Sequence, residues 1–187
     1  MAVIRIKNMV CPRCIETVRE TLVFLNVHIL SIDLGEVVID RELSGEELIQ
    51  LQTKLISKGF ELLEDRNAIL VDKVKSTIIE HIHYNKGELK VNFSTVLSET
   101  LDQDYTKLSK LFSNAEGITI EKFINKQKIE KVKELIEYNE LNLSEIAFHL
   151  NYSSLAHLSS QFKKETGMTP STYKKLEHKE RNTLDAL

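Results

Sequence analysis

The chain has 187 residues, 42% of them hydrophobic and 28% charged, with two prolines and no tryptophan. These values are ordinary for a globular protein of one or two domains, and so few prolines argue against a long disordered stretch. The formal net charge is −3. Residues 1–70 carry 8 basic and 11 acidic side chains, whereas residues 71–187 carry 17 of each. This balance excludes a strongly basic protein, so a DNA-binding face would have to gather its lysines locally.

Cysteine usage and hydrophobic patterning indicate where the protein works. Cys11 and Cys14 are the only cysteines, fewer and closer together than in a secreted disulfide-bonded domain. Charged residues at positions 5 and 7 interrupt any signal-peptide core. No stretch approaches the roughly 20 apolar residues of a membrane span. We therefore expect a cytoplasmic protein with reduced thiols and no membrane partner.

Residues 1–66 alternate between strand and helix patterns. Alternating apolar residues predict strands around Ile4–Ile6, Leu30–Leu34, Val37–Ile39 and Phe60–Leu63. Helical spacing predicts one helix with the stripe Ile15, Val18, Leu22 and Leu25, and a second with Leu48, Leu51 and Leu55. Ser44 and Glu47 form a capping box that opens the second helix, and Gly59 follows its end. The order βαββαβ predicts a ferredoxin-like sandwich, and thus an α+β fold class for the chain.

Cys11 and Cys14 lie between the first strand and the first helix, where two thiols can converge on one ion. The start of the helix is expected to lower the thiol pKa. Thiolates select Cu(I) or Zn(II) among biological metals. A closed zinc site usually needs four ligands, so a single pair favours Cu(I), with Zn(II) or another soft metal as alternatives. A redox dithiol, or a pair without function, stays open.

The same region resembles a heavy-metal-associated domain, the module of copper chaperones. The resemblance is carried by Asn8-Met9-Val10-Cys11-Pro12-Arg13-Cys14 and by Gly59-Phe60. Asn8 and Val10 depart from the Gly and Thr of that family's motif. The resemblance implies metal binding by Cys11 and Cys14.

The second half of the chain is predicted to be helical. A charged linker is expected at 64–69, followed by a helix with Val71, Val74, Ile78 and Ile82 on one face that breaks around Gly87. We place a first domain at 1–66, a helical domain at 70–178 and a polar, fraying tail at 179–187. His81 and His83 are two positions apart on this helix, do not face each other, and are expected to be solvent-exposed.

Two segments, 94–112 and 144–162, share the layout of a short helix, a tight turn and a second helix. Asp102 and Asn151 occupy the turns, where a left-handed backbone is needed and Asp or Asn tolerates it. Asp104 and Ser154 then suit the N-cap positions. Between the segments, 121–138 predicts a helix of about 27 Å, which approaches the ~34 Å between successive major-groove faces.

The run from Leu143 to Ser154 and the run from Leu158 to Lys175 closely resemble the AraC-family signature. The likeness covers about residues 72–176 and implies two helix-turn-helix units, each with a recognition helix. Leu155 and Ala156 can contact thymine methyl groups but cannot read hydrogen-bond donors and acceptors. The second helix-turn-helix is therefore expected to contribute more to the positioning of DNA than to the reading of its base sequence. The DNA-binding residues implied by the resemblance are Thr106, Ser109 and Lys110, then Leu155, Ala156, His157 and Ser160, with Lys163 and Lys164 on the backbone.

The sequence therefore predicts a sequence-specific DNA-binding transcription regulator that responds to Cu(I) or another soft metal, with double-stranded DNA as its partner. A second copy of the chain and a metal chaperone are further candidate partners. No nucleophile–base pair, phosphate loop or paired carboxylates indicate an enzyme. The alternative is a metal-trafficking or sequestering protein whose helical half binds proteins, and a thiol redox switch is a third hypothesis.

Overall fold

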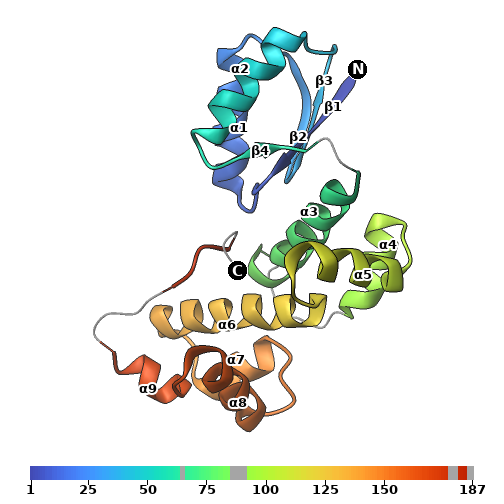
Figure 1. Ribbon diagram of the computed structural model, residues 1–187. Coiled ribbons are helices and arrows are strands. Elements are labelled where there is room, and N and C mark those ends of the chain that lie inside the picture. Colours follow the sequence, from blue (N-terminus) through green and yellow to red (C-terminus); the bar gives the residue numbers. More distant parts are fainter. Residues whose placement is uncertain (64–65, 85–91, 177–180, 185–187) are drawn as a thin grey trace. The chain divides into compact units, whose positions relative to one another are not determined.

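The computed structural model describes residues 1–63, 66–84, 92–176 and 181–184 (Figure 1). The chain divides into two compact units, Met1–Thr77 and Ile78–Leu187. Along the described ranges no helix is both long enough and apolar enough to cross a membrane. The two units are considered separately below.

In the first unit, two helices cover one face of a four-stranded sheet (Figure 1). The sheet order is β2-β3-β1-β4, and every neighbouring pair is antiparallel. The predicted element order βαββαβ is confirmed. The elements are β1 (Ala2–Lys7), α1 (Pro12–Phe24), β2 (Ile29–Asp33), β3 (Glu36–Ile39), α2 (Gly45–Ile56) and β4 (Glu61–Leu62).

The core of the first unit lies between the sheet and these two helices. Ile6, Val37 and Ile39 of the sheet and Leu22 and Leu55 of the helices are fully buried. The Ser44 capping box is confirmed, because the Ser44 hydroxyl accepts from Glu47 N and the Glu47 carboxylate accepts from Ser44 N. The burial of the apolar side chains between the sheet and the helices is the main stabilising contribution in this unit.

Two predicted core positions are wrong. Leu30 is 43% exposed, because an irregularity in the pairing of β2 with β3 between Ile29 and Ser31 breaks the simple alternation. Leu48 is 40% exposed, so the buried stripe of α2 consists of Leu51 and Leu55.

Helix α3 (Arg66–Ile79) begins where the sequence predicts a linker, so the linker prediction is wrong from residue 66 onward. Residues 64 and 65 lie outside the described residues, as does Gly87 with its predicted helix break. A π-helical turn, Glu80–Tyr84, follows α3 directly. The predicted apolar face is confirmed, because Val71, Val74, Ile78 and Ile82 are all buried.

The second unit is built around one long helix, α6 (Ile120–Tyr138), with a helix pair at each end (Figure 1). The buried face of α6 includes Phe123, Ile129, Val132 and Ile136, and the polar side chain of Gln127 is also buried. The other helices are α4 (Phe93–Leu101), α5 (Tyr105–Glu116), α7 (Leu143–His149), α8 (Leu155–Thr166) and α9 (Pro170–Lys174).

The sequence predicts a polar tail that frays, but part of this tail, residues 181–184, is held by hydrogen bonds. Arg181 donates to Glu134 at 3.1 Å, and the Asn182 backbone N–H donates to Glu130 at 3.2 Å. The carbonyl of Leu184 accepts from Gln127 Nε2 at 3.0 Å. Three polar side chains of α6 thus form hydrogen bonds with residues 181–184 and hold this segment along the helix.

Candidate nucleic-acid interface

The two helix pairs have the same turn geometry. Asp102 ends α4 with φ 48° and ψ 47°, and Asn151 has φ 54°. Both predictions of a left-handed residue are therefore confirmed. Asp104 caps α5 by accepting from Lys107 N at 3.1 Å, and Ser154 caps α8 by accepting from His157 N at 3.0 Å. These caps fix where each second helix begins and which side chains it turns outward.

The inner faces of α5 and α8 anchor them to the unit. Phe112 of α5 packs against Phe123 of α6, with ring centroids 5.5 Å apart. Phe162 of α8 packs edge-on against Tyr173 of α9 at 5.4 Å. Ala147 of α7 is buried and small, and its carbonyl accepts the backbone N–H of Tyr152 at 2.8 Å. Because the aromatic faces are buried, the opposite faces of α5 and α8 are left to solvent.

On α5, the side chains of Thr106 and Lys110 are exposed, and Ser109 is half-buried between them. These three residues lie within one turn of each other on the helix surface. The arrangement leaves one hydroxyl and one ammonium group free to meet a ligand, with a second hydroxyl at the margin.

On α8, the predicted DNA-binding residues all lie on the exposed surface: Leu155, Ala156, His157, Ser160, Lys163 and Lys164. His157 is held in place, because its Nδ1 lies 3.0 Å from the Ser153 hydroxyl and its ring stands edge-on to Tyr152 at 5.5 Å. The imidazole is thereby oriented before any ligand binds.

The lysines of α6 differ between its two halves. Lys131 pairs with Glu134 at 2.5 Å, and Lys133 pairs with Glu130 at 2.6 Å. Lys128 lies over the ring of Tyr152, and burial lowers its pKa. In the first half of α6, Lys122 and Lys126 form no ion pair with any part of the chain that the structure describes.

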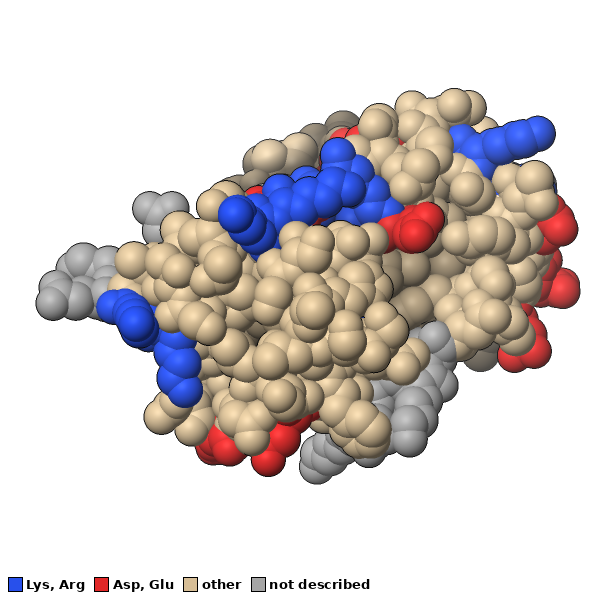
Figure 2. All heavy atoms as spheres, turned by 90° about the horizontal axis from the view of Figure 1, so that it is seen from below, with Lys and Arg blue, Asp and Glu red and all other residues tan. Residues whose placement is uncertain are grey.

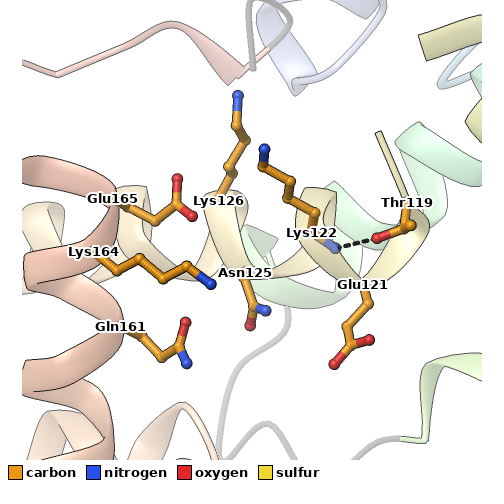
Figure 3. Close-up of a pocket in the computed structure, with 8 residues that line it drawn as sticks. All are labelled: Thr119, Glu121, Lys122, Asn125, Lys126, Gln161, Lys164 and Glu165. Atoms are coloured by element: carbon orange, nitrogen blue, oxygen red, sulfur yellow. Dashed lines mark hydrogen bonds between the residues drawn. The ribbon is translucent and has the colours of Figure 1, made fainter. Parts of the chain in front are cut away.

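A pocket of about 550 Å³ lies between the start of α6 and α8 (Figure 3). Lys164 and Gln161 extend from α8 toward Asn125 of α6, and Lys122 and Lys126 rise from α6 on one side (Figure 3). We call this site the lysine pocket; it is defined by Lys122, Asn125, Lys126, Gln161, Lys164 and Glu165. A second carboxylate, Glu121, lines its outer margin.

The sequence points to Lys164 but not to the rest of the lysine pocket. The available signal was the four-residue spacing of Lys122 and Lys126, which places both on one helix face. On the surface seen in Figure 2, Lys and Arg side chains gather in a group beside a carboxylate, and much of the remaining surface is uncharged. On this face, positive charge is therefore local.

Cys11 and Cys14 lie at the start of α1, with their Sγ atoms 3.0 Å apart and both side chains half-buried. Burial raises the pKa of the Cys14 thiol, with its hydrogen bond to Cys11 as a second cause. The expected lowering is therefore wrong for Cys14. No cluster of three or more His, Cys, Asp or Glu side chains that could hold a metal occurs in the described ranges.

The prediction that His83 is solvent-exposed is wrong, because its side chain is largely buried. Its Nε2 lies 3.0 Å from Gln127 Oε1, and burial lowers its pKa to about 4. The π-helical turn changes the direction of the side chain relative to the regular helix that the sequence suggests. His83 thus has a structural role in the second unit.

Comparison with known proteins shows what the second unit is similar to. Residues 97–176 match a protein-family model described as a helix-turn-helix domain. The C-terminal domain of AraT, a response regulator from Geobacillus stearothermophilus, is similar over 63% of this chain and 97% of that chain, with a TM-score of 0.50 and 24% identity. The fold of the second unit is therefore similar to AraC-type helix-turn-helix domains, as the sequence predicts.

Two curated relatives are transcription regulators. A xylose operon regulatory protein from Haemophilus influenzae is 28% identical over 99 residues, which cover 52% of this chain and 25% of that protein. An uncharacterized HTH-type transcriptional regulator from Staphylococcus aureus is 28% identical over 127 residues, which cover 68% of this chain and 17% of that protein. The chain thus spans a quarter or less of their lengths. Metal binding by Cys11 and Cys14 stays a prediction.

Proposed function

We propose that the protein is an AraC-type transcription regulator that binds double-stranded DNA sequence-specifically through α5 and α8. The observation that carries this proposal is the duplicated helix pair, in which each second helix is N-capped, anchored by a buried aromatic face and free on its other face. Helix α6, with 19 residues, is about 28 Å long, which approaches the ~34 Å between successive major-groove faces.

The two recognition helices have different surface chemistry. On α5, Thr106, Ser109 and Lys110 offer donors that can read base edges. On α8, Leu155 and Ala156 contact thymine methyl groups, His157 and Ser160 supply the polar contacts, and Lys163 and Lys164 bind phosphates. We therefore assign most of the base reading to α5 and most of the positioning to α8.

The test is fluorescence anisotropy with a labelled duplex from upstream of the gene and a scrambled duplex of the same composition. Lys110→Ala should lower specific affinity by about 1–3 kcal/mol and reduce the preference for the native duplex. Ser171→Ala, an exposed serine on α9, is the matched control and should behave like the unmodified protein. Equal affinity of the unmodified protein for both duplexes would exclude sequence-specific binding.

We further infer that the first unit is a ferredoxin-like, heavy-metal-associated module that binds Cu(I) through Cys11 and Cys14. Asn8 supports this, because its φ of 71° lies in the left-handed region that glycine adopts most readily, and the motif that it resembles has glycine at this position. Its Nδ2 donates to the Gly59 carbonyl at 2.9 Å, and Met9 is completely buried. The loop is thereby anchored on both sides, while the two thiols stay accessible.

Coupling of metal to DNA binding would begin at this loop. The backbone N–H of Asn8 points to the carboxylate of Asp72 in α3 at 3.5 Å, and α3 runs on to Ile79, past the division between the units. A bound ion must favour one arrangement of the loop over another in order to shift DNA affinity.

The experiment that decides is Cu(I) titration followed by DNA binding on the same preparation, repeated with Cys11→Ser. A copper-dependent change in DNA affinity that Cys11→Ser abolishes supports the regulator. Copper binding without any DNA affinity at low salt favours the metal-trafficking or sequestering alternative, in which the second unit binds a protein such as a metal chaperone.

A further inference from the structure

His157, in the first turn of α8, is exposed and yet held at three points. Its backbone N–H donates to the Ser154 hydroxyl at 3.0 Å, which fixes the start of the helix. Its Nδ1 lies 3.0 Å from the Ser153 hydroxyl, and its ring stands edge-on to Tyr152, with centroids 5.5 Å apart. A side chain that is already oriented loses less rotamer freedom on binding, so these contacts favour a role in recognition.

Tyr152 is a rigid support for this imidazole. Its side chain belongs to the buried cluster of the second unit, and the residue is only 8% exposed. Its backbone N–H donates to the carbonyl of Ala147 at 2.8 Å, and the ammonium group of Lys128 lies 5.3 Å from its ring centroid. The support is therefore part of the folded core, and its position does not depend on a ligand.

The contact with Ser153 determines which nitrogen of His157 is left for a base. Nδ1 and Nε2 point in different directions from the ring, so a bond at Nδ1 leaves Nε2 for an external partner. A serine hydroxyl can donate or accept, and the neutral imidazole carries its proton on the nitrogen that does not accept. When the hydroxyl donates to Nδ1, the proton is on Nε2, which is also the more stable tautomer of a neutral histidine in water. Nε2 is then a hydrogen-bond donor.

A donor at this position selects a base with an acceptor on its major-groove edge. Guanine presents two neighbouring acceptors, N7 and O6, whereas adenine presents N7 beside an amino donor. The carbon-bound hydrogens that flank Nε2 carry partial positive charge, so they attract the guanine O6 and are repelled by the adenine amino group. Leu155 and Ala156 cannot form such hydrogen bonds, so in the first turn of α8 this reading falls to His157.

We propose that Ser153 is a positioning residue that fixes His157 as a donor through Nε2, and that His157 reads N7 of a guanine. This rests on the proposed DNA-binding function and gives α8 one base-specific polar contact. Ser153 precedes the recognition helix and acts on the base only through the imidazole.

The tautomer is measured on the full chain without DNA. Long-range proton–nitrogen correlation NMR spectra at alkaline pH, where imidazoles are neutral, distinguish the two nitrogens, and the spectrum of His157→Ala assigns the signals. We expect a protonated Nε2 in the unmodified protein and a larger share of protonated Nδ1 in Ser153→Ala. Ser153→Thr keeps the hydroxyl and should restore the unmodified spectrum. A proton mainly on Nδ1 in the unmodified protein would overturn the proposal.

Base reading is measured by anisotropy with the duplex from upstream of the gene. Each guanine in turn is replaced by 7-deazaguanine, which lacks N7 but keeps its base pairing. At one position we expect a loss of about tenfold in affinity for the unmodified protein. The same replacement should cost His157→Ala nothing further, because the two changes remove one contact. Ser153→Ala should lower affinity for the intact duplex about threefold, and Ser171→Ala, the matched control, should leave it unchanged.

The outcomes separate this proposal from DNA binding itself. If every loss caused by 7-deazaguanine persists in His157→Ala, the guanine contact is excluded while DNA binding stands. A loss that requires His157 but follows 7-deazaadenine would likewise overturn the choice of guanine. A protein without affinity for the upstream duplex would overturn both proposals.

Discussion

His83 and Gln127 are joined by a 3.0 Å contact between Nε2 and Oε1, which ties the π-helical turn to the buried face of α6. Gln127 is fully buried and donates through its Nε2 to the carbonyl of Leu184. A single side chain of α6 therefore links the turn before the helix-turn-helix units to a segment after them. The neutral imidazole is the form that this arrangement accommodates.

The protein should lose stability as pH falls from about 6.5 to 4 because of His83. Burial lowers the His83 pKa from 6.5 to about 4 in the folded state. The unfolded chain therefore binds more protons in that range, and the free energy of unfolding falls as pH decreases through it. The loss is at most about 3 kcal/mol. Urea unfolding across this range measures it.

His83→Gln should flatten that pH dependence, because the substituted side chain does not titrate. The control, His28→Gln, removes an exposed imidazole from the first unit. If the variant and the unmodified protein keep the same slope between pH 6.5 and 4, His83 is not the group responsible.

The left-handed residues in the two turns should tolerate glycine but not alanine. Asn151→Ala is expected to destabilise the protein by roughly 1 kcal/mol, because a Cβ without a polar group disfavours positive φ. Asn151→Gly should be close to neutral. Thermal unfolding of both variants, with the same pair at Asp102, measures the difference; equal stability of the alanine and glycine variants would contradict the turn geometry.

The ion pair between Lys133 and Glu130 is buried, with side chains 9% and 3% exposed. Lys133→Met leaves the carboxylate buried without its cation and should cost about 3–5 kcal/mol. The double variant Glu130→Met, Lys133→Met should be closer to the unmodified protein, since no unpaired charge stays buried. Chemical denaturation of the two variants tests this order of stability, which a double variant less stable than Lys133→Met would reverse.

Metal stoichiometry should distinguish Cu(I) from Zn(II). If Cys11 and Cys14 form the site, Cu(I) binds one ion per chain, whereas Zn(II) binds one ion between two chains and promotes a homodimer. Native mass spectrometry with each metal provides the measurement, and Cys14→Ser should remove both forms. Zinc bound tightly to a monomer would show that another ligand takes part.

Local sequence signals predicted much of the structure. The left-handed turns at Asp102 and Asn151 follow from steric tolerance at a single residue, so they could be predicted without knowledge of the packing. The Ser44 capping box is similarly local. The exposure of Leu30 depends on an irregular pairing with another strand, which no alternation pattern contains.

The features that the sequence did not predict depend on distant parts of the chain. The lysine pocket is formed by α6 and α8, and its lysines lie about forty residues apart. The burial of His83 needs both a π-helical turn and the opposing Gln127. The raised pKa of Cys14 follows from burial, whereas the sequence reveals only its place near a helix start. Tertiary contact decides each of these properties.

The two carboxylates beside the lysine pocket have a kinetic consequence. A more basic surface would release more counterions on any duplex and would hold arbitrary sequences longer. Glu121 and Glu165 line the same pocket as Lys122, Lys126 and Lys164, and their carboxylates reduce the net positive charge there. A chain with this charge balance would leave unrelated sequences quickly and sample many sites before it reaches a target.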